Sequence, residues 1–181
     1  MSCRRQFVTP ILISALLLSA IPAQSQDSET DRKAAEQDIF ALVIRNQMEN
    51  WIRDGDKSEA EAKSESDKAI AQHLNFKVFF IEIQGKDPSD DFISRFSDLP
   101  RVIKKISSEK PAKGPHTPVD KSSGRTGIIF SVDSIRWQSK DLAEVEGGYY
   151  CGGLCAAGIT FTVERANGKW LIKSSRMNWI S

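Results

Sequence analysis

The sequence contains few residues of the kinds that build metal sites. Its 181 residues include three cysteines and two histidines. Protein metal sites draw on clusters of histidine, cysteine and carboxylate ligands at short spacings. Neither His73 nor His116 has a cysteine or a metal-spaced acidic set near it in the chain. The sequence therefore predicts no metal site, and it assigns neither histidine a catalytic role.

An excess of charge of one sign is also lacking. The chain has 25 lysines and arginines against 24 acidic residues, a formal net charge of +1. Bulk charge therefore gives no support for a nucleic-acid partner. The sequence also lacks a phosphate-binding loop, a dinucleotide fingerprint and a nucleophile elbow. We predict no cofactor, and the catalytic residues of any activity stay unknown.

Long apolar runs are missing after residue 21. The only such run covers residues 7–21, with Arg4 and Arg5 before it and small residues after it. This order is typical of a secretory signal peptide, and we expect cleavage after Ala23 or after Ser25. A retained membrane anchor is the alternative, although about 15 residues is short against the roughly 20 that a spanning helix needs. We therefore expect a periplasmic or secreted chain without a stable membrane span after cleavage.

Cleavage would leave two cysteines, Cys151 and Cys155. An even number of cysteines in an exported chain favours a disulfide. Redox exchange is the alternative role for the pair. Redox-active pairs usually have two residues between the cysteines, whereas this pair has three. The sequence therefore predicts a structural disulfide.

We predict that residues 24–181 form a single α+β domain with its core within 31–180. Apolar residues recur at helical spacing over residues 31–53, so we expect a long helix there that ends at Gly55. A second, mostly exposed helix is expected from about Ser58. The apolar stripe of the long helix consists of Phe40, Val43, Ile44, Met48 and Trp51.

The middle of the chain predicts smaller elements. Residues 76–84 form a nearly continuous apolar run, which indicates a buried strand. Asp87 and Pro88 are a helix-start signal for a short helix. Residues 101–107 fit either a strand or a helix. Residues 109–127 are rich in proline and glycine and should form a loop.

The last fifty residues carry the strongest pattern. Asn167-Gly168 predicts a two-residue hairpin turn that pairs Ala166 with Lys169 and Thr162 with Lys173. Placing Cys151 opposite Cys155 pairs Val145 with Phe161, so that apolar residues share one face. An alternation that slips near Asp133 indicates a β-bulge. We therefore expect a curved, four-stranded antiparallel meander whose apolar inner face is covered by the long helix.

This order of elements resembles the nuclear-transport-factor-2-like (NTF2-like) superfamily, a cystatin-like cone in which a curved sheet wraps a long helix. Trp51, Gly55 and Asp56 are similar to the Trp–Gly–Asp ending of that family's first helix, with one extra residue. The stretches 85–89 and 147–155 are similar to exported bacterial proteins of no assigned activity. The resemblance implies a cone-shaped α+β fold. The superfamily includes isomerases, dehydratases and binding modules, so the fold alone implies no activity.

Four aromatic residues are candidates for a pocket in such a cone. Trp137, Tyr149 and Phe161 share the expected inner face, and Trp51 lies on the helix that covers it. An open cone would make them a hydrophobic pocket lining, whereas a closed one would make them core. Trp179 would complete the rim or cover a sheet edge.

Our functional prediction is a non-enzymatic module that binds a small apolar ligand or a protein partner. The alternative is an isomerase, dehydratase or hydrolase that acts in the cone pocket. A third hypothesis is assembly, in which the outer face of the sheet, with Thr160, Thr162 and Lys173, docks on a second copy. The oligomeric state, including a dimer, is left open.

Overall fold

The computed structural model describes residues 24–181, excluding the side chains of residues 24–28 and 72–74. The expected signal peptide, residues 1–23, lies outside the described residues. Among the residues described, no helix is long and apolar enough to cross a membrane. In chain order the elements are α1 (Gln24–Glu61), α2 (Glu65–Leu74), β1 (Val78–Ile83), α3 (Asp90–Ser94), β2 (Val102–Lys105), the 3₁₀ turn η1 (Ile106–Ser108), β3 (Gly127–Ser139), β4 (Leu142–Gly152), β5 (Cys155–Ala166) and β6 (Lys169–Ile180).

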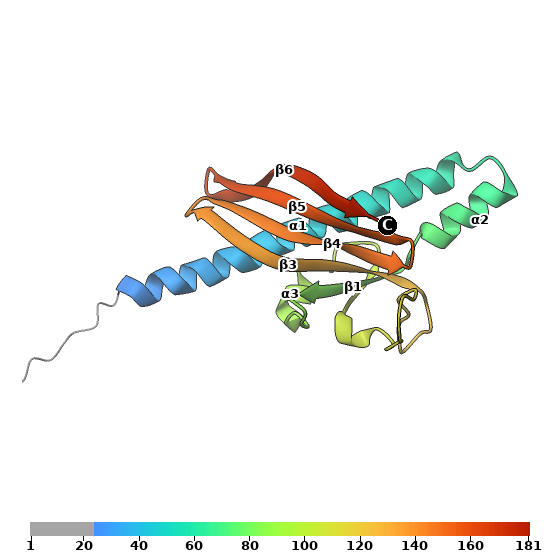
Figure 1. Ribbon diagram of the computed structural model, residues 1–181, viewed down its shortest axis with the longest axis horizontal. Coiled ribbons are helices and arrows are strands. Elements are labelled where there is room, and N and C mark those ends of the chain that lie inside the picture. Colours follow the sequence, from blue (N-terminus) through green and yellow to red (C-terminus); the bar gives the residue numbers. More distant parts are fainter. Residues whose placement is uncertain (1–23) are drawn as a thin grey trace, which may run out of the picture.

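The six strands form one mixed sheet in the order β2-β1-β3-β4-β5-β6. Figure 1 labels β1 and the strands from β3 to β6. Strand β1 pairs in parallel with both β2 and β3, and β3 to β6 pair antiparallel. The predicted fold, a four-stranded antiparallel meander cone with one additional strand, is therefore wrong. The error has a physical cause: a continuously apolar strand has no alternation, and so its sequence does not reveal which neighbour it pairs with.

The hairpin registers inside this sheet follow the predicted pairs. Val145 lies opposite Phe161, and Ala166 lies opposite Lys169 across the Asn167-Gly168 turn. Asn167 and Gly168 both have positive φ, as a type I′ turn requires. The bulge in β3 falls between Val132 and Ser134.

Two local pairings differ from the prediction because the ladder contains further irregularities. Cys155 lies opposite Gly152 instead of Cys151, after a register shift that follows Tyr150. Thr162 pairs with Ser174, one residue beyond the expected Lys173. Each bulge adds one unpaired residue to a strand, which shifts the partners that follow it.

Helix α1 is longer than its apolar pattern predicts, since it continues through Gly55 to Glu61. A helical glycine costs about 1 kcal/mol relative to alanine, and contacts beyond Gly55 offset this cost. The Arg101 guanidinium bonds to Asp56 and to the Asn75 side chain, at 3.2 and 2.9 Å. Asn75 in turn donates to Glu59. The last turns of α1 are thereby tied to the segments before β1 and β2.

The two smaller helices begin at caps that differ from the predicted starts. Helix α2 begins after Ser64, whose hydroxyl and amide exchange hydrogen bonds with the amide and carboxylate of Asp67, a reciprocal cap. The amide of Phe92 in α3 donates to the Ser89 hydroxyl at 3.1 Å. Asp87, the expected cap, instead accepts from the Ser107 amide. Both predicted starts, Ser58 and Asp87, are therefore corrected.

The hydrophobic core lies between α1 and the inner face of the sheet. Ile44 and Met48 of α1 are fully buried, together with Phe130 and Val145. Phe161 is 2% exposed. These side chains fill the space between the helix and the sheet, so the concave face is occupied by core packing.

The segment between η1 and β3 is a loop that backbone bridges and an ion pair hold in one conformation. Two isolated antiparallel β-bridges of the backbone pair Glu109 with Asp120 and Val119 with Thr126. The Asp120 carboxylate is 2% exposed and accepts from the Lys104 ammonium at 2.7 Å. This bond and those from Ser123 lower the pKa of Asp120. The predicted loop is therefore held in place by an ion pair between the buried Asp120 and the partly exposed Lys104.

Candidate functional site

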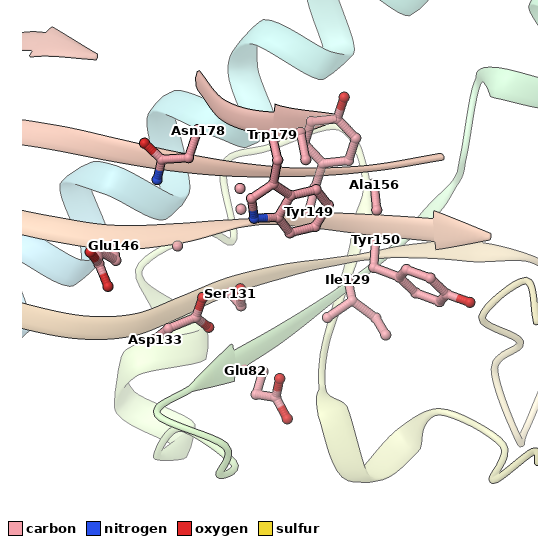
Figure 2. Close-up of a pocket in the computed structure, with 14 residues that line it drawn as sticks. Glu82, Ile129, Ser131, Asp133, Glu146, Tyr149, Tyr150, Ala156, Asn178 and Trp179 are labelled. Carbon is pink, nitrogen blue, oxygen red and sulfur yellow. The ribbon is translucent and has the colours of Figure 1, made fainter. Parts of the chain in front are cut away.

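A groove with a volume of about 420 Å³ lies on the outer face of the sheet, the side opposite α1. Its lining residues come from β1, β3, β4, β5 and β6, so five of the six strands contribute to it. The lining residues are Glu82, Ile129, Ser131, Asp133, Glu146, Gly147, Gly148, Tyr149, Tyr150, Ala156, Ala157, Gly158, Asn178 and Trp179. Figure 2 shows the labelled members of this set.

Glycines form the floor of the groove. A Cβ atom at Gly148 would overlap the backbone carbonyl of Ala157, and one at Gly158 would overlap the indole of Trp179. Neither glycine has positive φ, so both are required for close approach and not for backbone conformation. The absent side chains leave bare backbone, across which Trp179 of β6 lies.

Trp179 is the wall of the groove and is 56% exposed. It pairs with Gly158 in the β5–β6 ladder. The neighbouring Asn178 sits at the register shift, and its amide donates to the Thr160 hydroxyl at 2.9 Å. This bond fixes the bulged residue beside the indole. A large aromatic face is thereby presented to the groove and to solvent.

One end of the groove is acidic. Glu82 comes from β1, Asp133 from the bulge in β3 and Glu146 from β4, and Figure 2 shows them on the same side of Trp179. The Ser134 hydroxyl donates to Glu146 at 3.1 Å. Partial burial, together with the negative charge of Asp133, raises the pKa of Glu82.

The other end of the groove is apolar. Ile129, Tyr150 and Ala156 lie there, to the right of the indole in Figure 2, whereas Asp133 and Glu146 lie to its left. The Tyr150 hydroxyl accepts from the backbone amide of His116 at 2.8 Å, which ties the loop before β3 to Tyr150.

No lysine, arginine or histidine is present among the described residues that line the groove. The acidic end therefore has no cation of its own. Such a site suits an organic cation that carries an apolar or aromatic group, since the carboxylates would attract the charge and the indole would contact the rest. Among the side chains that the structure describes, no group of three or more histidine, cysteine or acidic residues could hold a metal ion.

The aromatic residues proposed for the cone pocket are placed differently from one another. Phe161 is buried in the core. Tyr149 has its ring against Trp51 of α1, with the ring centroids 4.9 Å apart, although the residue is also in the groove lining. The ring centroids of Trp137 and Trp170 lie 5.6 Å apart, at the end of the sheet where α1 begins. The structure therefore does not bring the four together around one pocket.

The cysteines and His116 lie near the hairpin that joins β4 to β5. Cys151 and Cys155 are at disulfide distance, with their Cα atoms 5.2 Å apart. The His116 ring bonds to Glu109 and to the Gly114 carbonyl, each at 2.9 Å. These bonds raise the pKa of His116 and give it a structural role in the loop. The side chain of His73 lies outside the described residues.

Comparison of the chain with protein-family models, curated proteins and solved structures finds no match. The resemblance to the nuclear-transport-factor-2-like superfamily stays a prediction.

Proposed function

We propose that this chain is a non-enzymatic binding module and that the outer-face groove is its ligand site. The ligand class is an organic cation with an apolar or aromatic group. The observation that carries this proposal is the combination of Glu82, Asp133 and Glu146 with the Trp179 indole on a glycine floor, without a basic residue in the described lining.

Electrostatics favours a cation at the acidic end. The Asp133 charge disfavours ionisation of Glu82, and a bound ammonium or guanidinium group would relieve that repulsion. An aromatic group packed against the exposed indole of Trp179 contributes about 0.5–1.5 kcal/mol beyond the area that it buries. The apolar part of the ligand would cover Trp179 and reach toward Ile129 and Tyr150.

Calorimetric titration with tryptamine tests this function, because tryptamine combines an ammonium group with a flat ring. Indole-3-propionate carries the same ring with a negative charge and should not bind. We expect Asp133→Asn and Trp179→Ala to weaken tryptamine binding by about tenfold each, or about 1.4 kcal/mol. Asp91→Asn removes one negative charge from α3, outside the groove lining, and should leave binding unchanged. Equal binding of both probes, or insensitivity to Asp133→Asn, would contradict the proposal.

A second candidate function rests on the raised pKa of Glu82. A carboxyl group that keeps its proton to higher pH and lies beside a second carboxyl group, that of Asp133, is suited to general acid–base work. This favours the isomerase, dehydratase or hydrolase alternative, acting in the outer-face groove. Turnover in a screen of small-molecule substrates, abolished by Glu82→Gln, would establish it in place of pure binding.

The proposal also places the protein in the periplasm or outside the cell. The cysteine pair at disulfide distance is compatible with an oxidising compartment. Sequencing the N-terminus of the exported protein tests this placement, with a start at Gln24 or Gln26 expected. Recovery of the whole protein in the cytoplasmic fraction with free thiols would contradict it.

A further inference from the structure

A second groove lies at the other end of the molecule, where α1 begins and two hairpins turn. Its volume is about 610 Å³. Its lining includes Trp137 near the end of β3, Lys140 in the β3–β4 turn, Arg165 at the end of β5 and Trp170 at the start of β6. Helix α1 contributes Arg32. Three chain segments far apart in sequence thus meet around one depression.

Two tryptophans form its apolar wall. The rings of Trp137 and Trp170 meet edge to face, with centroids 5.6 Å apart and an interplanar angle of 70°. The Trp137 indole N–H donates to the Glu36 carboxylate at 3.0 Å, which fixes its orientation. A pair of half-buried rings held in this way offers a preformed apolar surface.

Cations lie over both rings. The Arg32 guanidinium is 5.2 Å from the centroid of Trp137, and the Arg165 guanidinium is 5.9 Å from that of Trp170. Lys140 adds a third positive charge. Against these three cations stand two acids, Asp31 in the described lining and Glu36, whose carboxylate lies 3.6 Å from the Arg32 Nε. Arg165 is exposed, and so its donors can turn toward a ligand while its plane stays on the ring.

We propose that this groove is a second binding site, for anions that carry an aromatic or apolar group. Its charge is opposite to that of the outer-face groove, and it does not depend on the function proposed for that groove. The anionic group would bond to Arg165 and Arg32, and the apolar part would lie against Trp137 and Trp170. A free carboxylate or sulfonate and a lipid headgroup share this chemistry.

Calorimetric titration of the full mature chain with naphthalene-2-sulfonate tests the site, with 2-naphthylmethylammonium as the probe of reversed charge. We expect the sulfonate alone to bind. Arg165→Gln should weaken it by about tenfold, while Arg165→Lys, which keeps the charge, should retain part of the binding. Arg176→Gln removes the same charge from β6 outside this groove and should have no effect. Circular dichroism verifies that each variant is folded.

The outcomes separate this site from the first and from a lipid surface. Saturating tryptamine should not displace the sulfonate if the two grooves are distinct, whatever the fate of the outer-face proposal. Failure of the sulfonate to bind, or an equal loss in Arg165→Gln and Arg176→Gln, would overturn the inference. Binding to phosphatidylglycerol vesicles without binding of the free sulfonate would also overturn it, in favour of a membrane-surface role.

Discussion

Single glycines determine whether the outer-face groove exists. Gly158→Ala should fold, because the new methyl group meets the movable indole of Trp179, but it should displace the ring and weaken tryptamine binding. Gly148→Ala should instead destabilise the protein by about 1–3 kcal/mol, because its methyl group meets the rigid carbonyl of Ala157. Urea unfolding and calorimetry on both variants check the contrast, which is lost if the two variants behave alike.

Gln47 is a polar residue of α1 that is buried in the hydrophobic core. It is 6% exposed, and neither its Nε2 nor its Oε1 bonds to a described residue. A buried polar group without a partner costs about 1–3 kcal/mol. Gln47→Met keeps the shape without the polar atoms, and we expect the free energy of unfolding to rise by about 1 kcal/mol. A loss of stability in urea would show that the amide has a partner in solution.

The ionised form of Glu82 should lower the stability of the fold and strengthen the binding of a cationic ligand. Its pKa is raised in the folded state, so the protonated carboxyl is the form that the fold prefers. Its contribution to stability is therefore present at low pH and is lost as pH rises through the folded pKa. Glu82→Gln mimics the neutral form, and we expect it to raise stability at neutral pH while it weakens tryptamine binding. Unfolding curves across a pH series check the sign, and an unchanged pH dependence would contradict it.

At the scale of elements, the β4–β5 hairpin combines a cysteine pair with a short loop. A disulfide across so short a loop is expected to contribute about 2 kcal/mol in the chain-entropy model. Cys151→Ala with Cys155→Ala should lower the free energy of unfolding by that amount and leave the register intact, because Val145 and Phe161 still pair through the core. Urea unfolding measures the first effect. Loss of the dispersed amide NMR signals of the β4–β5 hairpin in this variant would show that the cysteines, and not the alternation of apolar residues, determine the register.

The elements that the sequence predicted are those with local signals. The Asn167-Gly168 turn and the alternation through Val145 determine registers that the structure confirms. The sequence does not reveal the parallel pairing of β1 with β3, because the first four residues of β1 are apolar on both faces of the strand. Without that pairing the sequence cannot place Glu82 at the acidic end, because Glu82 reaches the groove only by lying opposite Ser131 of β3.

The other parts of the site had partial signals. The slip near Asp133 located the bulge but did not show which way the carboxylate would point. Alternation in β4 places Glu146 and Gly148 on the face opposite the apolar residues. The sequence therefore allows a groove on that outer face to be predicted. The apolar alternation by itself favours a pocket on the inner face, where Phe161 is instead buried in core packing.

At the scale of the whole molecule, a nearly neutral chain separates its charges between two grooves. The net charge of +1 gives no sign of this. The outer-face groove is acidic, and the groove between Trp137 and Trp170 is basic. Each lies where strands or turns distant in sequence meet, so neither can be read from a contiguous motif.

The most direct test of the central claim is amide and indole chemical-shift mapping by NMR during a tryptamine titration. The account predicts that the largest shifts occur at Gly148, Gly158 and the Trp179 indole N–H, on the face opposite α1. Shifts concentrated instead at Trp51 and Phe161 would contradict it, because they would place the ligand between the helix and the sheet.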